Sequence, residues 1–184
     1  MRKSILAAVV GLCFAASVGT SIAGEAEQDK KSRQGTVRCG GNHFLRLNGT
    51  EIQWTSYIFR NYNSTTPITI RRLVLFDATG SVLRDTNING FPDFANGVLG
   101  PADHVLDANQ TASLDTLGLP FLSDTQRPIQ LEIEWSAPEK ALTLDVSLVR
   151  LSNRRDPATG AILEERGRLL RDCRTIRFGD RDKD

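Results

Sequence analysis

The stretch IQLEIEW, residues 129–135, alternates apolar and polar side chains without exception. Successive side chains of a β-strand point to opposite faces of a sheet, so this period of two places one apolar face on a core and one polar face in water. A helix would scatter the same apolar residues around its circumference. The stretch therefore predicts a half-buried strand.

Strand-like segments also precede this stretch. IQWTSYIFRN (52–61) and ITIRRLVLFD (68–77) are rich in β-branched and aromatic residues, and an Asn- and Pro-containing break at 63–67 separates them. A turn at 77–80, with Gly80 where a positive φ is needed, leads to residues 81–84. We expect these three segments to form an antiparallel meander.

The C-terminal part continues the pattern. ALTLDVSLVRL (141–151) predicts a strand whose inward side chains are Leu142, Leu144, Val146 and Leu148. A turn at 156–160 follows, and residues 161–178 predict one or two more strands. Because no segment carries an apolar stripe at helical spacing over three turns, we expect an all-β fold, a single antiparallel β-sandwich of about 7–9 strands.

Several strand–turn–strand elements carry a family resemblance. They are the Asn-rich turn before Pro67-Ile68-Thr69-Ile70, the pair Phe76-Asp77 followed by Gly80, and Gly100-Pro101 ahead of another strand. In these elements, the chain between Ile52 and Trp135 resembles the immunoglobulin-like or fibronectin-type sandwich domains of exported bacterial proteins. Many of those are known only as domains of unknown function, so the resemblance implies a fold and no functional residues.

The N-terminus predicts export. Arg2 and Lys3 precede an apolar run from Ile5 to Val18, and small residues follow at positions 21–23, where signal peptidase acts. The run would span about 21 Å as a helix, less than a membrane core of about 30 Å, so we expect no transmembrane segment in the mature chain. The predicted organisation is a signal peptide (1–23), a disordered leader (24–35), a sandwich domain (36–178) and a disordered tail (179–184). The expected location is the periplasm or the outside of the cell.

Two cysteines remain after the predicted cleavage, Cys39 and Cys173. In an oxidising compartment such an isolated pair predicts a disulfide, here between the first and last strands of the domain. It would close a loop of about 135 residues and contribute on the order of 5 kcal/mol in the chain-entropy model. A metal or redox site at these residues is the alternative.

The loop from Asp85 to Asp93 is a candidate calcium-binding loop. Asp85, Asn87, Asn89 and Asp93 take the first, third, fifth and ninth places of an EF-hand-like loop, and a glycine takes the sixth. The twelfth place is Asn96, which cannot supply a bidentate carboxylate, and no helix leads into the loop. A weak calcium site and an ordinary surface turn both fit, and calcium is the one cofactor that the sequence suggests.

Arginines gather near the C-terminus. Removing Arg2 and Lys3 changes the formal charge from +1 to −1, so overall charge implies no special partner. Antiparallel pairing about the turn at 156–160 would nevertheless bring together a basic ridge, namely Arg150, Arg154, Arg155, Arg166 and Arg168. Such a ridge would attract an anionic polymer or an envelope protein, whereas a hairpin neutralised by its own acids needs no partner. Few aromatic residues lie near these arginines, so we expect no nucleic-acid partner.

Nothing in the sequence defines a catalytic group. It has no Gly-x-Ser-x-Gly elbow and no His-Glu-x-x-His motif, and His43 and His104 are its only histidines. The sequence therefore favours a binding or accessory module of the periplasm or cell surface. The alternative is an enzyme that acts on an envelope polymer through an unrecognised carboxylate-based site.

Overall fold

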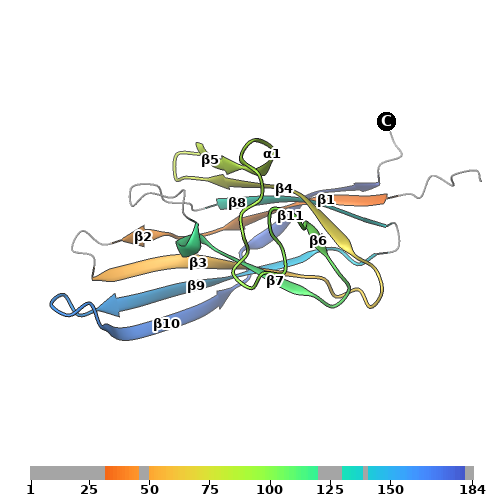
Figure 1. Ribbon diagram of the computed structural model, residues 1–184. Coiled ribbons are helices and arrows are strands. Elements are labelled where there is room, and N and C mark those ends of the chain that lie inside the picture. Colours follow the sequence, from red (N-terminus) through yellow and green to blue (C-terminus); the bar gives the residue numbers. More distant parts are fainter. Residues whose placement is uncertain (1–31, 46–49, 120–129, 139–140, 181–184) are drawn as a thin grey trace, which may run out of the picture.

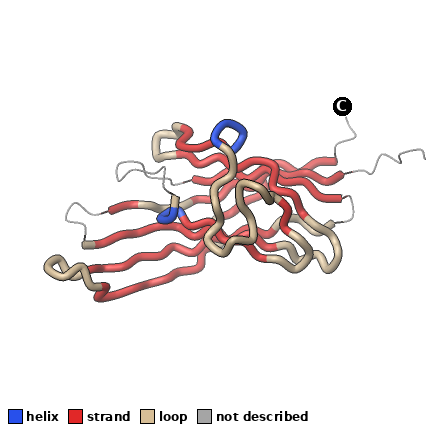
Figure 2. Tube along the Cα trace, viewed as in Figure 1, coloured by secondary structure: helices blue, strands red, loops and turns tan. Residues whose placement is uncertain are grey.

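The computed structural model of the chain describes residues 32–45, 50–119, 130–138 and 141–180. These residues form two antiparallel sheets, one above the other in the view of Figure 1. Strands make up most of the trace in Figure 2, and its helical parts are the short α1 (Thr86–Asn89) and a 3₁₀ turn (Thr116–Gly118). The all-β prediction is confirmed for this part of the chain.

The first sheet has the order β11-β1-β8-β4-β5, with β6 also pairing with β4. Its strands are β1 (Ser32–Gly40), β4 (Ile68–Phe76), β5 (Val82–Asp85), β6 (Val105–Leu106), β8 (Gln130–Pro138) and β11 (Cys173–Asp180). The second sheet has the order β10-β9-β3-β2, with β7 also pairing with β3. Its strands are β2 (Phe44–Leu45), β3 (Glu51–Arg60), β7 (Thr111–Asp115), β9 (Asp145–Arg155) and β10 (Ile162–Leu170).

The alternating strand lies at the centre of the first sheet. In β8 the side chains of Leu131, Ile133 and Trp135 are buried, and the polar side chains between them are only partly exposed. Gly35 lies opposite Trp135 in the register of β1 and β8. A Cβ atom at Gly35 would come within 2.8 Å of the indole ring, so the glycine lets the ring pack across β1.

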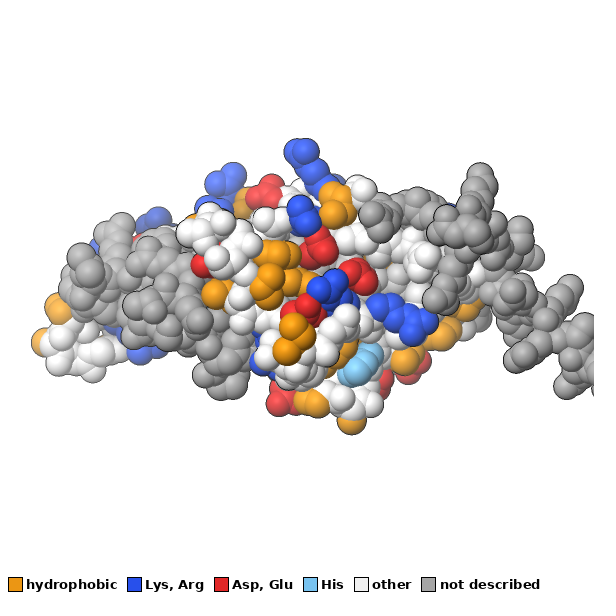
Figure 3. All heavy atoms as spheres, turned by 90° about the horizontal axis from the view of Figure 1, so that it is seen from above, with side chains coloured by type: hydrophobic (Ala, Val, Ile, Leu, Met, Phe, Trp, Pro, Cys, Tyr) orange, Lys and Arg blue, Asp and Glu red, His pale blue; other side chains and the backbone are white. Residues whose placement is uncertain are grey.

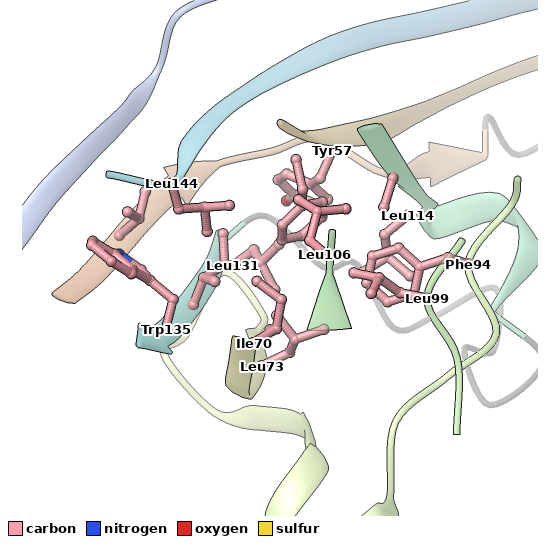
Figure 4. Packing of buried hydrophobic residues seen from close by; sticks show 14 of the residues in the cluster. Tyr57, Ile70, Leu73, Phe94, Leu99, Leu106, Leu114, Leu131, Trp135 and Leu144 are labelled. Carbon is pink, nitrogen blue, oxygen red and sulfur yellow. The ribbon is translucent and has the colours of Figure 1, made fainter. Parts of the chain in front are cut away.

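The core fills the space between the sheets. Figure 4 shows Trp135 beside Leu144 at one end, and Phe94, Leu99 and Leu114 together at the other. The Tyr57 ring lies inside this cluster, and burial raises the pKa of its hydroxyl above the usual value. Its apolar contacts contribute to stability in proportion to the area removed from water.

Several predicted details are wrong. The expected three-strand meander does not form, because β3 belongs to the second sheet while β4 and β5 pair in the first. The chain changes sheets between residues 61 and 67, where Asn61 is buried and bonded to the loops around it. The described part also has eleven strands, more than the predicted 7–9, because the two-residue strands β2 and β6 carry no pattern that a sequence can show.

The predicted ends of the domain also differ from the structure. β1 begins at Ser32, within the segment predicted as a disordered leader, because backbone pairing with β8 and β11 orders residues that have little apolar surface of their own. β11 runs to Asp180, two residues into the predicted tail. Leu142 is 56% exposed instead of facing inward, because β9 begins only at Asp145. The signal peptide and Ile129 lie outside the described residues.

Candidate functional site

The second sheet continues past the end of the core. Tyr57, Leu148 and Leu170 lie side by side on β3, β9 and β10 and form its last apolar rung on that side. Beyond them, the strands run on toward the turn at 156–161, and in Figure 1 the left ends of β3, β9 and β10 extend past those of β4 and β8. We call this extension the arm, comprising residues 51–54, 150–155 and 162–168 with the turn between β9 and β10.

One face of the arm is dominated by arginine. Opposite residues of paired strands point to the same face, and alternate residues of a strand share it. The register therefore puts a set of polar side chains on the side of the sheet that carries the core further along. We call this set the arginine face: Arg150, Arg154, Arg166 and Arg168, with Glu51, Gln53, Ser152 and Glu164.

The charges on the arginine face do not cancel. Arg166 donates hydrogen bonds to the Glu164 carboxylate at 2.7 Å from Nε, and its Nη2 lies 2.5 Å from the same oxygen. Arg150 and Arg168 are directly opposite one another on β9 and β10, a like-charge pairing that a sheet does not favour by itself. In the described part of the chain, no ion pair includes Arg150, Arg154 or Arg168. Four guanidinium groups therefore face two carboxylates.

The arginine face also contains a depression. It has a volume of about 220 Å³ and is lined by Glu51, Ser152, Asn153, Arg154, Glu164 and Arg166. Its lining combines hydrogen-bond donors from guanidinium and hydroxyl groups with two carboxylates. Such a surface can hold an anionic group, such as a sulfate or phosphate ester, between the guanidinium groups.

The structure of the arm shows that part of the predicted basic ridge is wrong. Arg155 lies opposite Ile162, and the register places it on the other face of the sheet from Arg154. Two nearby acids that could neutralise the ridge are engaged elsewhere: Asp145 pairs with Arg60 at 3.3 Å, and Asp156 caps its own turn. Backbone N–H groups of Thr159 and Ala158 bond the Asp156 carboxylate and hold its pKa below the usual value. Gly160 closes this turn with a φ of 70°.

By contrast, the outer face of the first sheet contains two ion pairs, although Arg38 also lies opposite Arg174 in the register of β1 and β11. Arg38 forms an ion pair with Glu132, and Arg72 pairs with Glu134 at 3.1 Å. Figure 3, which views the molecule from above, shows acidic and basic side chains interspersed near the centre of this side. A surface with both signs intermixed creates no strong field, so the arginine face is the stronger candidate for binding an anion.

The structure gives the residues of the predicted calcium loop other contacts. The Asp85 carboxylate caps α1 by accepting a hydrogen bond from the Asn87 N–H at 3.0 Å, and Arg72 donates to both its oxygens at 2.9 and 2.5 Å. The side-chain oxygen of Asn89 accepts a hydrogen bond from the Asp85 N–H, and Asp93 lies against Gly100. Calcium binding here stays a prediction, and an ion would compete with Arg72 for Asp85. The described residues contain no cluster of three His, Cys, Asp or Glu side chains able to hold a metal.

The Arg72–Asp85 pair predicts how stability depends on pH. Hydrogen bonds from Arg72 hold the pKa of the Asp85 carboxyl below its usual value, so the pair stabilises the fold above the unfolded-state pKa of about 4. This contribution is lost as the pH falls through the lowered folded-state pKa. We expect Asp85→Asn to cost about 1–3 kcal/mol at neutral pH, measured by urea unfolding, and the difference from wild type to shrink on acidification. A difference that stays constant from neutral to acidic pH would contradict this role.

The predicted disulfide is present. Cys39 and Cys173 are bonded, with their Cα atoms 4.0 Å apart, and they lie opposite one another on β1 and β11. Cys39 is fully buried, whereas Cys173 borders a cavity of about 500 Å³ beside β1 and β9. The cavity is lined by Arg33, Val37, Tyr62, Leu142, Thr143, Leu144, Asp145, Val146, Cys173 and Thr175.

Both histidines contact loop residues among the residues that the structure describes. His104 stacks on Phe91 with ring centroids 3.8 Å apart, and its Nε2 lies 3.2 Å from the Pro101 carbonyl oxygen. His43 Nδ1 lies 3.2 Å from the Thr116 hydroxyl. Both contacts are typical of histidines that help to hold loops in place.

Sequence reasoning missed a buried polar centre. The Asn61 side chain is 1% exposed, and its amide nitrogen lies 2.8–3.0 Å from the carbonyl oxygens of Thr66, Leu106 and Asp107. Its side-chain oxygen accepts hydrogen bonds from Asn63, which in turn bonds Leu142. The sequence Asn61-Tyr62-Asn63 signals only a turn, and nothing in it shows that the turn is buried.

No protein-family model, curated protein or solved structure matches the chain. In the part that the structure describes, no helix has the length and apolar character needed to cross a membrane. The inferences below therefore rest on the residues of this chain alone.

Proposed function

We propose that this protein is an exported binding module that holds an anionic polymer of the cell envelope on its arginine face. The observation that carries the proposal is the excess of guanidinium groups on one face of an arm that extends beyond the core. Export is supported by the pattern of the first 23 residues.

The placement of the charge is the first reason. Packing does not require arginines on the arm, because the apolar core ends at the rung of Tyr57, Leu148 and Leu170. The direct opposition of Arg150 and Arg168 costs stability, and a bound anion would remove that cost. A polymer with repeated negative charges could contact several arginines at once and fill the depression beside Arg154 and Arg166.

An enzyme with paired carboxylates has less support. A glycosidase-like site needs two carboxyl groups on one cleft. The larger cavity contributes one carboxylate from the described residues, that of Asp145, and it pairs with Arg60. The depression on the arginine face is lined by two carboxylates, but Glu164 pairs with Arg166 and Glu51 accepts a hydrogen bond from Gln53 at 3.0 Å. We therefore argue for the binding function.

We also propose an immunoglobulin-like class for the sandwich. The support is that β3 pairs with β7 in one sheet while β4 pairs with β8 in the other, as strands B and E and strands C and F do in that fold. β9 lies beside β3, where strand A would be expected, and β1 lies beside β8, where strand G would be expected. The proposed class is therefore a variant with exchanged outer strands.

The binding proposal predicts salt-dependent retention on immobilised dextran sulfate, a sulfated polymer used here as a probe. Arg154→Gln with Arg168→Gln should weaken binding by about tenfold at low ionic strength, as two exposed charge contacts are lost. The matched control is Arg171→Gln with Arg174→Gln, which removes the same charge from exposed positions outside the arm. Retention is measured as the salt concentration at elution.

The control variant distinguishes binding at the arginine face from attraction by the overall positive charge of the surface. A marked shift for the arm variant with a smaller one for the control supports the arginine face. Equal shifts for both variants, or no retention of the wild-type protein at low salt, would contradict the proposal. Retention of an acidic protein from envelope extract, with none of dextran sulfate, would instead indicate a protein partner.

A further inference from the structure

The outer edge of β10 is open. β10 is the last strand of the second sheet and pairs only with β9 in the described part of the chain. Seven of its nine residues are exposed and the other two are partly exposed. Figure 1 shows it along the lower margin of the molecule, with no described strand on its other side. Such an edge presents unpaired backbone N–H and C=O groups to any strand that can approach.

We propose that β10 pairs antiparallel with β10 of a second copy of this chain, so that the two second sheets join into one continuous sheet. Its sequence, ILEERGRLL (162–170), supports this pairing because it is complementary to its own reverse. With Arg166 on the twofold axis, Glu164 lies opposite Arg168 of the second copy. In the same register Leu163 lies opposite Leu169.

The complementarity selects one register. A shift of two residues in one direction places Ile162 opposite Arg168 and Leu163 opposite Gly167. A shift in the other direction places Arg166 opposite Arg168 and Glu165 opposite Leu169. Both shifts lose the Leu163–Leu169 pair and leave these leucines opposite a glycine or a glutamate, so the centred register is the favoured one.

The exposed leucines fit the same pairing. Leu163 is 55% exposed and Leu169 is 57% exposed. Both are large apolar side chains that lie on an edge strand and face water in the single chain. In the centred register each leucine gains an apolar neighbour from the second copy. The two Arg166 side chains would approach on the axis, and each is already paired with its own Glu164.

The twofold axis of such a dimer stands perpendicular to the sheet, so each face of one sheet continues into the same face of the other. The two arginine faces would then form one surface across the axis. The pairing depends only on the edge of β10, and it holds or fails whatever the arginine face binds.

The first experiment measures the oligomeric state of the full chain by sedimentation velocity over a range of concentrations. We expect a monomer–dimer equilibrium, and Leu169→Asp should weaken it by about tenfold. The matched control is Ile176→Asp, at a position 52% exposed on β11 of the other sheet, which should leave the equilibrium unchanged. A wild-type protein that stays monomeric at its highest soluble concentration would overturn the proposal, as would a dimer that Ile176→Asp weakens and Leu169→Asp does not.

The second experiment tests the register and does not depend on how the Leu169 variant folds. In a Cys13→Ser background, Arg166→Cys should form a disulfide-linked dimer on mild oxidation, because the two copies of position 166 meet on the axis. Glu165→Cys is the control, since position 165 lies opposite position 167 of the other copy. Cross-linking at 165 and not at 166 would overturn the centred register, and the absence of cross-linking at both positions would overturn the pairing of β10.

Discussion

Replacing Cys39 and Cys173 together by alanine is expected to lower the free energy of unfolding by up to about 5 kcal/mol, measured by urea unfolding under oxidising conditions. The bond joins residues 134 apart in sequence, so it removes much of the conformational freedom of the unfolded chain. Small domains have total stabilities of only about 5–15 kcal/mol. The loss should therefore leave the protein marginally folded or unfolded.

The contribution of the cross-link to this loss can be measured separately from the contribution of the packing of the sulfur atoms. Wild-type protein in reductant keeps both sulfurs and loses only the cross-link, so it should lose most of the stability that the double variant loses. Cys39 is fully buried, and a larger loss in the variant than in the reduced protein measures its packing contribution. A reduced protein as stable as the oxidised one would contradict the entropic account.

The strands that could be predicted are those with an unambiguous period. Residues 130–135 of β8 alternate in sequence and in burial, and the hairpin of β9 and β10 turns where Pro157 and Gly160 predict a turn. In these places local pattern and tertiary environment agree, because one side of the strand is buried and the other is not. The disulfide was predicted from the number of cysteines and the expected compartment, without any pattern of strands.

The assignment of strands to sheets could not be predicted in the same way. The segments 52–61 and 68–77 have the character of neighbouring strands, and consecutive strands usually pair. Whether a connection makes a hairpin or crosses to another layer depends on what its residues bond. Here the buried amide of Asn61 lies at the crossing, and its partners at Leu106 and Asp107 lie more than forty residues away.

The candidate site was predicted in part for the same reason. The sequence showed that arginines flank a reversal, and the register of β9 and β10 brings Arg150 beside Arg168. That Arg155 faces away from Arg154 follows from the period of two along β9, whereas the irregularity between Ile162 and Glu164, which sets the residues of β10 that lie opposite them, carries no sequence signal. Nor could the sequence show that the arm extends beyond the core, which depends on the length of the other sheet.

Asn61→Asp is expected to destabilise the protein by about 3 kcal/mol or more at neutral pH, although the two side chains have nearly the same shape. The side-chain nitrogen of Asn61 lies within hydrogen-bonding distance of three carbonyl oxygens in a site that is 1% exposed. A carboxylate has no hydrogen to donate and would face those three oxygens with a negative charge. Burial and the carbonyl dipoles would therefore raise the pKa of the new carboxyl.

The raised pKa gives the substitution a distinctive dependence on pH. The charge-related part of the loss is fully present above the folded-state pKa of the new carboxyl, and it disappears as the pH falls to the unfolded-state value of about 4. Compared with wild type at each pH by urea unfolding, Asn61→Asp should therefore lose less stability in acid than at neutrality. Asn87→Asp, at an exposed position of α1, is the matched control and should change stability by less than about 0.5 kcal/mol. A loss at position 61 that does not vary with pH would show that the new charge stays in water, and it would contradict the buried, hydrogen-bonded position of this side chain.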